Sequence, residues 1–144
     1  MDERLHKRLH LALALLFGLP GLLLGGTVAL VGVYSGVMQE TRLLSQLLLV
    51  CWGAAGALGI VAWVRIGADF LLQGRSGLQA MGRVWWGLLL LGAFAAIPAV
   101  VLGVVVGLTE RAQGFALLLY GPPLLLPAAH LAWLRWRLGC LQNA

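Results

Sequence analysis

Four long apolar runs without a formally charged residue limit what this chain can fold into. They cover residues 9–39, 43–64, 84–109 and 112–134. Each run can cross a bilayer, because a spanning helix needs about 20 apolar residues at a rise of roughly 1.5 Å per residue. The runs are continuous and do not alternate with polar residues, so helices are expected to satisfy the backbone in lipid.

These runs predict an all-α, polytopic membrane protein in which residues 1–144 form a single four-helix transmembrane domain. We expect spans at about 9–36, 43–64, 84–107 and 112–134, arranged as two consecutive hairpins that a connector at 65–83 joins. The composition agrees, since 61% of the residues are hydrophobic and 10% are charged. A water-soluble fold could not bury that much apolar surface.

The basic residues predict the orientation of this domain. Only Arg42 and Arg111 fall on one side of the four-span arrangement, and the other basic residues fall on the opposite side: Arg4, Lys7, Arg8, Arg65, Arg75, Arg83, Arg135 and Arg137. The positive-inside rule then places both termini and the connector in the cytoplasm. These groups flank apolar runs and form no basic stripe on a soluble domain, so the net charge of +5 does not indicate a nucleic-acid partner.

The balance of basic residue types suggests the source of the chain. Nine of the ten basic residues are arginine, which suggests a GC-rich bacterial genome and therefore a bacterial inner membrane. Five tryptophans are expected at its cytoplasmic interface, where indole rings favour the headgroup region: Trp63, Trp85, Trp86, Trp133 and Trp136.

Small residues recur at helical spacing on the first and third runs. The expected packing positions are Gly18, Gly21, Gly25, Gly32 and Gly36 on the first run, and Gly92, Ala96, Ala99, Gly103 and Gly107 on the third. In lipid, close approach of backbones replaces the hydrophobic effect as the force that brings helices together. We therefore expect both faces to pack against another helix.

Five prolines are expected to interrupt the helices, because proline lacks the backbone donor and bends the chain. They are Pro20, Pro98, Pro122, Pro123 and Pro127. The glycine-rich middle of the second run and the proline-rich middle of the fourth occupy matching places in the two halves. Interrupted helices at matching places can line a substrate site, here an almost wholly apolar one. Helix packing is the alternative explanation of the same residues.

Short matches between the halves raise the question of an internal duplication. Residues 21–24 and 87–90 both read GLLL, and AWVR ending at Arg65 resembles AWLR ending at Arg135. A duplicated hairpin would relate the halves by a pseudo-twofold axis along the membrane normal. The alternative is that depth in the bilayer sorts Leu, Trp and Arg in any span.

The connector is expected to be helical. Arg65 and Asp69 are four residues apart and can form an ion pair, so the second helix should continue out of the membrane for about two turns and stop at Gly74. Ser76 and Gln79 form a capping-box pattern, which predicts that the third helix begins there.

No constellation of catalytic residues is visible. The spans contain no Asp, Glu, Lys or Arg at depth, and buried ionisable groups usually mark pumps and intramembrane enzymes. We therefore expect no catalytic residue, no metal site, no cofactor and no enzymatic activity. His10 and His130 fall on the same side of the membrane and are candidate axial ligands for a haem. Their alternative role is that of interfacial histidines with one wet edge.

These features favour a small non-enzymatic inner-membrane protein that acts as an accessory, assembly or immunity-type subunit. Its partners would be the lipid bilayer and another membrane protein or a second copy of itself, through the small-residue faces. The first alternative is a small transporter or channel for an apolar or amphiphilic molecule. The second is a haem-binding membrane protein. Nothing in the sequence names a substrate.

Overall fold

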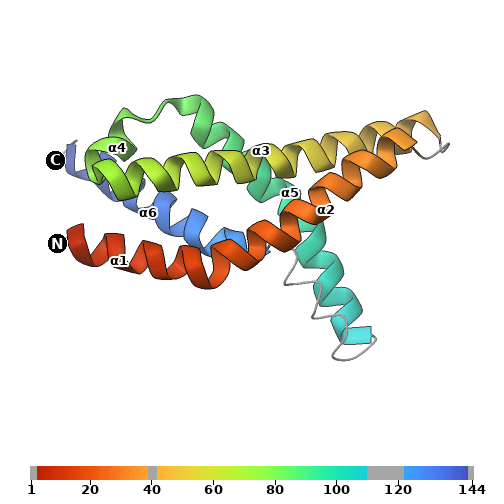
Figure 1. Cartoon of the computed structure of the whole chain (residues 1–144), viewed down its shortest axis with the longest axis horizontal. Coiled ribbons are helices and arrows are strands. Elements are labelled where there is room, and N and C mark those ends of the chain that lie inside the picture. Colours follow the sequence, from red (N-terminus) through yellow and green to blue (C-terminus); the bar gives the residue numbers. More distant parts are fainter. Residues whose placement is uncertain (1–2, 39–41, 110–121, 143–144) are drawn as a thin grey trace.

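The computed structural model describes residues 3–38, 42–109 and 122–142, and this part of the chain is all-α (Figure 1). The elements are α1 (Glu3–Leu13), a π-helix (Ala14–Gly18), α2 (Leu19–Met38), α3 (Leu43–Gln73), α4 (Arg75–Ala80), α5 (Arg83–Thr109), a 3-10 turn (Pro122–Leu124) and α6 (Leu125–Gln142).

Three helices are long and apolar enough to cross a membrane. They run over Arg4–Met38, Leu43–Gln73 and Arg83–Thr109, and they contain the first three predicted spans. Many of their leucine and valine side chains point outward, as lipid contact requires. The fourth predicted span, 112–134, falls partly outside the described residues. Within them, α6 is a shorter C-terminal helix that begins after the 3-10 turn.

The long helix α3 is the centre of the fold. It packs against α2 along one side and against α5 along another. The C-terminal helix α6 contacts α1, the π-helix and α3, so the start of α1 and the end of α6 lie at the same end of the molecule (Figure 1). The internal duplication stays a prediction.

The first span bends just before Pro20. Because Pro20 has no N–H, the carbonyl of Leu16 loses its helical donor. The chain adapts with the π-helix, in which the N–H of Leu19 donates to the carbonyl of Ala14, five residues earlier. Figure 1 shows α1 and α2 meeting at an angle at this point. The bend turns α1 towards α6.

The connector belongs to the core. Ile66 and Phe70 on α3, Leu78 on α4 and Leu131 on α6 are all buried, and they form one apolar cluster with Trp86 on α5. As predicted, α3 continues to Gln73, stops at Gly74 and carries the Arg65–Asp69 ion pair at 3.7 Å. The connector is thus a folded part of the bundle.

The predicted start of the third helix is wrong. The hydroxyl of Ser76 donates to the carbonyl of Gln73 at 2.7 Å, and α4 ends at Ala80 before α5 begins at Arg83. Gly77 explains the difference, because a Cβ at this position would lie 2.6 Å from the carbonyl oxygen of Asp69. The short α4 folds back onto α3 and cannot be the first turns of a straight α5.

The tryptophans differ in how far they are buried by the rest of the chain. Trp63 and Trp86 are 9% and 8% exposed and belong to the core, whereas Trp136 is 68% exposed. The guanidinium of Arg135 lies 4.5 Å from the centre of the Trp86 ring, and that of Arg65 lies 6.0 Å from the Trp85 ring. The expected aromatic belt is therefore partly an aromatic core.

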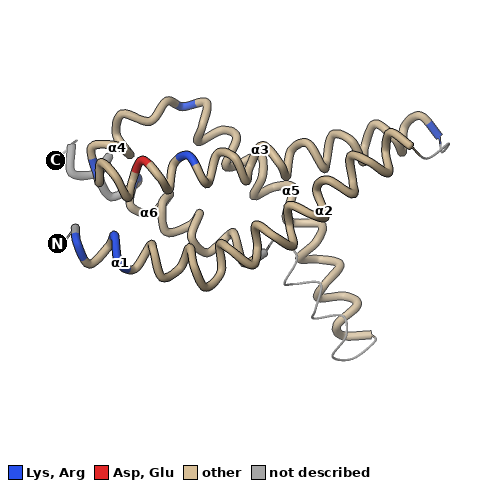
Figure 2. Tube along the Cα trace, viewed as in Figure 1, with Lys and Arg blue, Asp and Glu red and all other residues tan. Residues whose placement is uncertain are grey.

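The basic residues are concentrated at one end of the structure. Figure 2 shows most of the lysine and arginine positions near the termini and α4, and a further one at the opposite tip, where Arg42 precedes α3. Arg4, Lys7 and Arg8 are on α1, Arg65 is on α3, Arg75 is on α4, Arg83 begins α5 and Arg135 is on α6. The side chain of Arg137 and all of Arg111 lie outside the described part.

Candidate functional site

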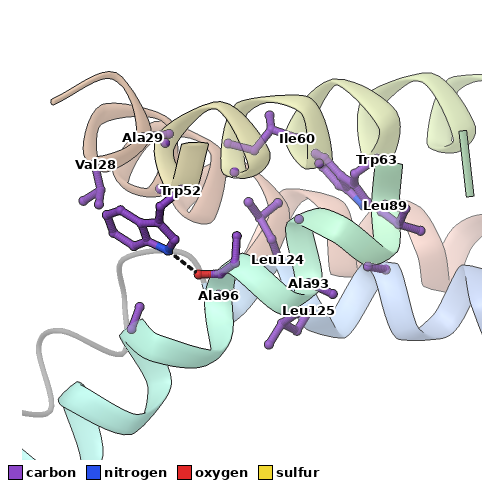
Figure 3. Close-up of a pocket in the computed structure, with 18 residues that line it drawn as sticks. Val28, Ala29, Trp52, Ile60, Trp63, Leu89, Ala93, Ala96, Leu124 and Leu125 are labelled. Carbon is purple, nitrogen blue, oxygen red and sulfur yellow. Dashed lines mark hydrogen bonds between the residues drawn. The ribbon is translucent and has the colours of Figure 1, made fainter. Parts of the chain in front are cut away.

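A pocket of about 90 Å³ lies where α2, α3, α5 and the start of α6 meet (Figure 3). Its walls are mainly glycine and alanine, and Trp52 and Trp63 on α3 are the largest side chains that line it. Leu124 and Ala128 complete the wall at the C-terminal segment. The pocket therefore has an almost wholly apolar lining, without a charged side chain.

Glycines bring the helices around this pocket close together. A Cβ on Gly53 would lie 2.6 Å from the carbonyl oxygen of Ala29, so α3 meets the backbone of α2 there. Gly59 contacts Gly92 at the crossing of α3 and α5, where a Cβ on Gly92 would lie 2.5 Å from the Gly59 Cα. No larger residue fits these positions without moving a helix.

Trp52 is held across the pocket by a hydrogen bond. Its Nε1–H donates to the carbonyl oxygen of Ala95 on α5 at 2.7 Å, and Figure 3 shows this bond as a dashed line. Pro98 lies inside α5 and cannot donate to the carbonyl of Phe94, so the helix backbone is weakened at this level. The indole of Trp52 on α3 therefore donates a hydrogen bond to α5 next to the place where Pro98 interrupts its hydrogen bonding.

The proline-rich segment reaches the same pocket. The 3-10 turn Pro122–Leu124 brings Leu124 against Gly21 of α2, where a Cβ would lie 2.8 Å from the Leu124 Cγ. Pro127 is fully buried in the first turn of α6, where proline is tolerated, and Pro123 is half-buried. The structure thus places the glycine-rich stretch of α3 and this segment around one cavity.

The small residues of the first span contact other parts of the same chain. Gly18 lies against the Trp63 ring, Gly32 lies near Trp52, and a Cβ on Gly36 would lie 2.9 Å from the carbonyl oxygen of Gln46. Gly25 lines the pocket. This face is therefore used within the fold.

The small residues of the third span divide into two groups. Gly92, Ala96 and Ala99 line the pocket, whereas Gly103 and Gly107 are buried further along α5. The periodic spacing was visible in the sequence. The sequence did not show which helices these residues would contact, because spacing along one helix does not identify its neighbour.

All three histidines of the chain meet at the other end of the bundle. The rings of His10 and His130, the two candidate haem ligands, have centroids 5.8 Å apart and planes inclined by 17°. His6 joins them, with its centroid 6.0 Å from that of His130. Sequence reasoning missed His6. The feature that could have identified it is its spacing of four residues from His10, which places both on one helix face.

In the histidine cluster, which is His6, His10 and His130, the two histidines of α1 are buried and His130 is half-buried. His6 is 8% and His10 is 1% exposed. Among the described residues, no group of three or more His, Cys, Asp or Glu side chains is arranged to hold a metal ion. The edge of the Phe70 ring packs on His10 and Trp133 contacts both other rings, so aromatic groups surround the cluster.

Comparison with known proteins identifies no family. No family model, curated protein or solved structure matches this chain. What the structure itself establishes is a helical protein with three candidate membrane spans. Any more specific function must be argued from the pocket and the histidine cluster.

Proposed function

We propose that this chain is a small non-enzymatic inner-membrane protein that binds an apolar or amphiphilic molecule in the pocket between α2, α3, α5 and α6. The observation that supports this function is the pocket itself. Glycine and alanine residues, together with Trp52, Trp63 and Leu124, line a pocket of about 90 Å³ among helices long enough to span a bilayer. Apolar pockets between helices are common ligand sites, and one of this size holds a short apolar segment, such as part of an acyl chain, with the rest of the molecule outside it.

The lining supports the chemical class of this ligand. None of the described residues that line the pocket is charged, so an uncharged ligand segment fits it. The Nε1–H of Trp63, a residue of the pocket wall, is buried and has no hydrogen-bond partner within the described part of the chain. An amphiphile with an acceptor oxygen near this indole would supply that partner.

The accessory-subunit function has lost part of its basis. It relied on small-residue faces being free to meet another protein, and Gly18, Gly21, Gly32 and Gly36 contact side chains or backbone of this chain. Their spacing therefore no longer requires a partner. An accessory, assembly or immunity-type role stays a prediction, and so does association with a second copy.

The charge distribution supports the placement of this protein with both termini and the connector in the cytoplasm. The positions of Arg4, Arg75 and Arg135 at one end and of Arg42 at the other agree with the positive-inside rule (Figure 2). In this orientation the histidine cluster lies towards the cytoplasm and the pocket lies deeper in the bilayer.

Fluorescence quenching by a dibrominated fatty acid tests the binding function. Bromine atoms near an indole quench its emission, and Trp52 and Trp63 both line the pocket. In purified protein in nanodiscs we expect saturable quenching by the brominated probe that an unbrominated fatty acid reverses by competition. Probe dissolved in the bilayer also quenches exposed indoles such as Trp136, so binding is measured only by the part of the quenching that the unbrominated fatty acid reverses.

Two variants that narrow the pocket make the experiment specific. Gly56→Ala adds a methyl group at 3.6 Å from the Ala29 Cβ, an ordinary contact, and Ala96→Leu adds a larger group to the opposite wall. We expect both to reduce the saturable quenching by severalfold. The matched control is Gly87→Ala, where the added Cβ meets nothing within 4 Å. Equal quenching in all four proteins would refute the pocket as the binding site.

Transport of the same molecule is a separate question. If the pocket is part of a pathway, vesicles that contain the protein will move the fatty acid across the membrane faster than empty vesicles, and Ala96→Leu will slow this movement. Binding without faster movement would assign the protein to binding alone.

A further inference from the structure

The histidine cluster joins the two ends of the chain. His6 and His10 are on α1 and His130 is on α6, so the ring contacts of 6.0 Å and 5.8 Å are contacts between these helices. Because α6 packs on α1, the π-helix and α3, the cluster lies at the place where the C-terminal helix docks. Its state of protonation therefore bears directly on the docking of α6.

The surroundings of the cluster are poor in groups that could stabilise a charged imidazole. The Phe70 ring meets His10 edge-on, and Gly67 lies close enough that a Cβ there would be 3.2 Å from the His10 Nε2. Four buried ring nitrogens have no hydrogen-bond partner among the residues that the structure describes: Nδ1 of His6, Nδ1 of His10, and Nδ1 and Nε2 of His130. A positive charge here would lose solvation without a polar partner to replace it.

The charged residues on the surrounding helices add to this effect. On α1 they are the acidic Glu3, at its first position, and the basic Arg4, Lys7 and Arg8. On α3 the carboxylate of Asp69 lies 3.7 Å from Arg65. On α6 the guanidinium of Arg135 lies over the ring of Trp86. Glu3 begins α1 and Asp69 pairs with Arg65, and the other charged residues described on these elements are basic.

We propose that the histidine cluster is a proton-sensitive contact that holds α6 against α1 while its imidazoles are neutral and releases α6 when they become protonated. Two positive rings about 6 Å apart repel each other, and the repulsion is large where water is excluded. The separation of α6 from α1 allows water to reach both rings. Acidification of the cytoplasmic side would thus loosen the C-terminal helix without unfolding the α2–α3 pair.

Distance measurements between spin labels test this proposal in the full chain. In a background of Cys51→Ala and Cys140→Ala, labels are placed on exposed positions of α1 and α6 with Leu9→Cys and Ala132→Cys. Distances are recorded in nanodiscs from about pH 8 to about pH 4, which covers ordinary and buried histidines. We expect the fraction at the short distance to fall severalfold at acidic pH and to recover at pH 8. An unchanged distribution would overturn the proposal.

Two controls separate this release from general acid unfolding. A label pair on α2 and α3, from Leu30→Cys and Leu47→Cys, should keep its distance over the same pH range. His130→Phe keeps an aromatic ring but removes the titrating group of α6, and we expect it to abolish the pH response between α1 and α6. If His130→Phe protein does not fold, the wild-type pH series still shows whether α6 separates from α1 at acidic pH.

Two results would contradict the proposal even if α6 moves. One is an equal response in His130→Phe, because repulsion between the imidazoles of α1 and α6 would then not be the cause. The other is a Soret band in purified protein that disappears in His130→Phe, which would assign His10 and His130 to haem ligation.

Discussion

Gly59 and Gly92 touch backbone to backbone where α3 crosses α5, without an intervening side chain. The contact fixes how closely these two spans approach. It also lies in the wall of the pocket, since both residues line it. Packing and cavity shape therefore depend on the same pair.

Gly92→Ala should destabilise the protein. The new Cβ would lie 2.5 Å from the Gly59 Cα, so α3 and α5 must separate, at a cost of about 1–3 kcal/mol in the free energy of unfolding. At Gly87 on the same helix the added Cβ has open space, and Gly87→Ala also removes a flexible residue. We therefore expect this variant to raise the free energy of unfolding by up to about 1 kcal/mol. Equilibrium unfolding in detergent measures both, and equal stabilities would contradict the crossing.

Gly74→Ala should also destabilise, for a different reason. Gly74 has φ of 69° and ψ of −139°, a conformation that residues with a Cβ rarely adopt, so the variant should cost about 1–3 kcal/mol. Gly82→Ala in the same connector serves as the control, because its added Cβ meets nothing within 4 Å. Thermal unfolding in detergent compares them. A smaller loss of stability in Gly74→Ala than in Gly82→Ala would contradict the positive φ angle of Gly74.

Trp52→Phe should remove the hydrogen bond to Ala95 while keeping an aromatic ring. We expect a loss of about 1 kcal/mol, the usual net value of one such bond. Trp136→Phe is the matched control, because Trp136 is largely exposed on α6. Chemical unfolding followed by circular dichroism provides the comparison, and a loss of similar size in both variants would show that the bond is not significant.

Cysteine accessibility tests the proposed orientation. In protein without native cysteines, Leu43→Cys at the start of α3 should react with a membrane-impermeant maleimide in intact cells. Ser76→Cys in α4 should react only after permeabilisation. Both positions are exposed in the structure, so burial does not limit either reaction. The reverse pattern would invert the topology.

Much of the architecture was predictable from local sequence. The apolar runs gave three spans, and the extension of α3 to Gly74 with its Arg65–Asp69 pair followed from helical spacing. These features depend on residues a few positions apart, for which periodicity and glycine chemistry are sufficient. His10 and His130 could be placed at one level of the membrane because both lie near basic ends of apolar runs.

Features that depend on contacts between distant segments could not be predicted. The start of α5 at Arg83 follows from the way Gly77 lets α4 pack on the carbonyl of Asp69. The burial of Trp63 follows from its contact with Gly18, 45 positions earlier in the sequence. The pocket arises from four segments whose relative positions no periodicity encodes.

The length of α3 has a mechanical consequence. Its 31 residues form one uninterrupted helix, roughly 46 Å from end to end, with the pocket against its middle and Gly74 at one tip. Such a rod tilts or slides as a unit because its backbone hydrogen bonds resist bending. A molecule bound in the pocket that displaced the middle of α3 would move both ends of this helix at once. The movement at Gly74 would then shift α4.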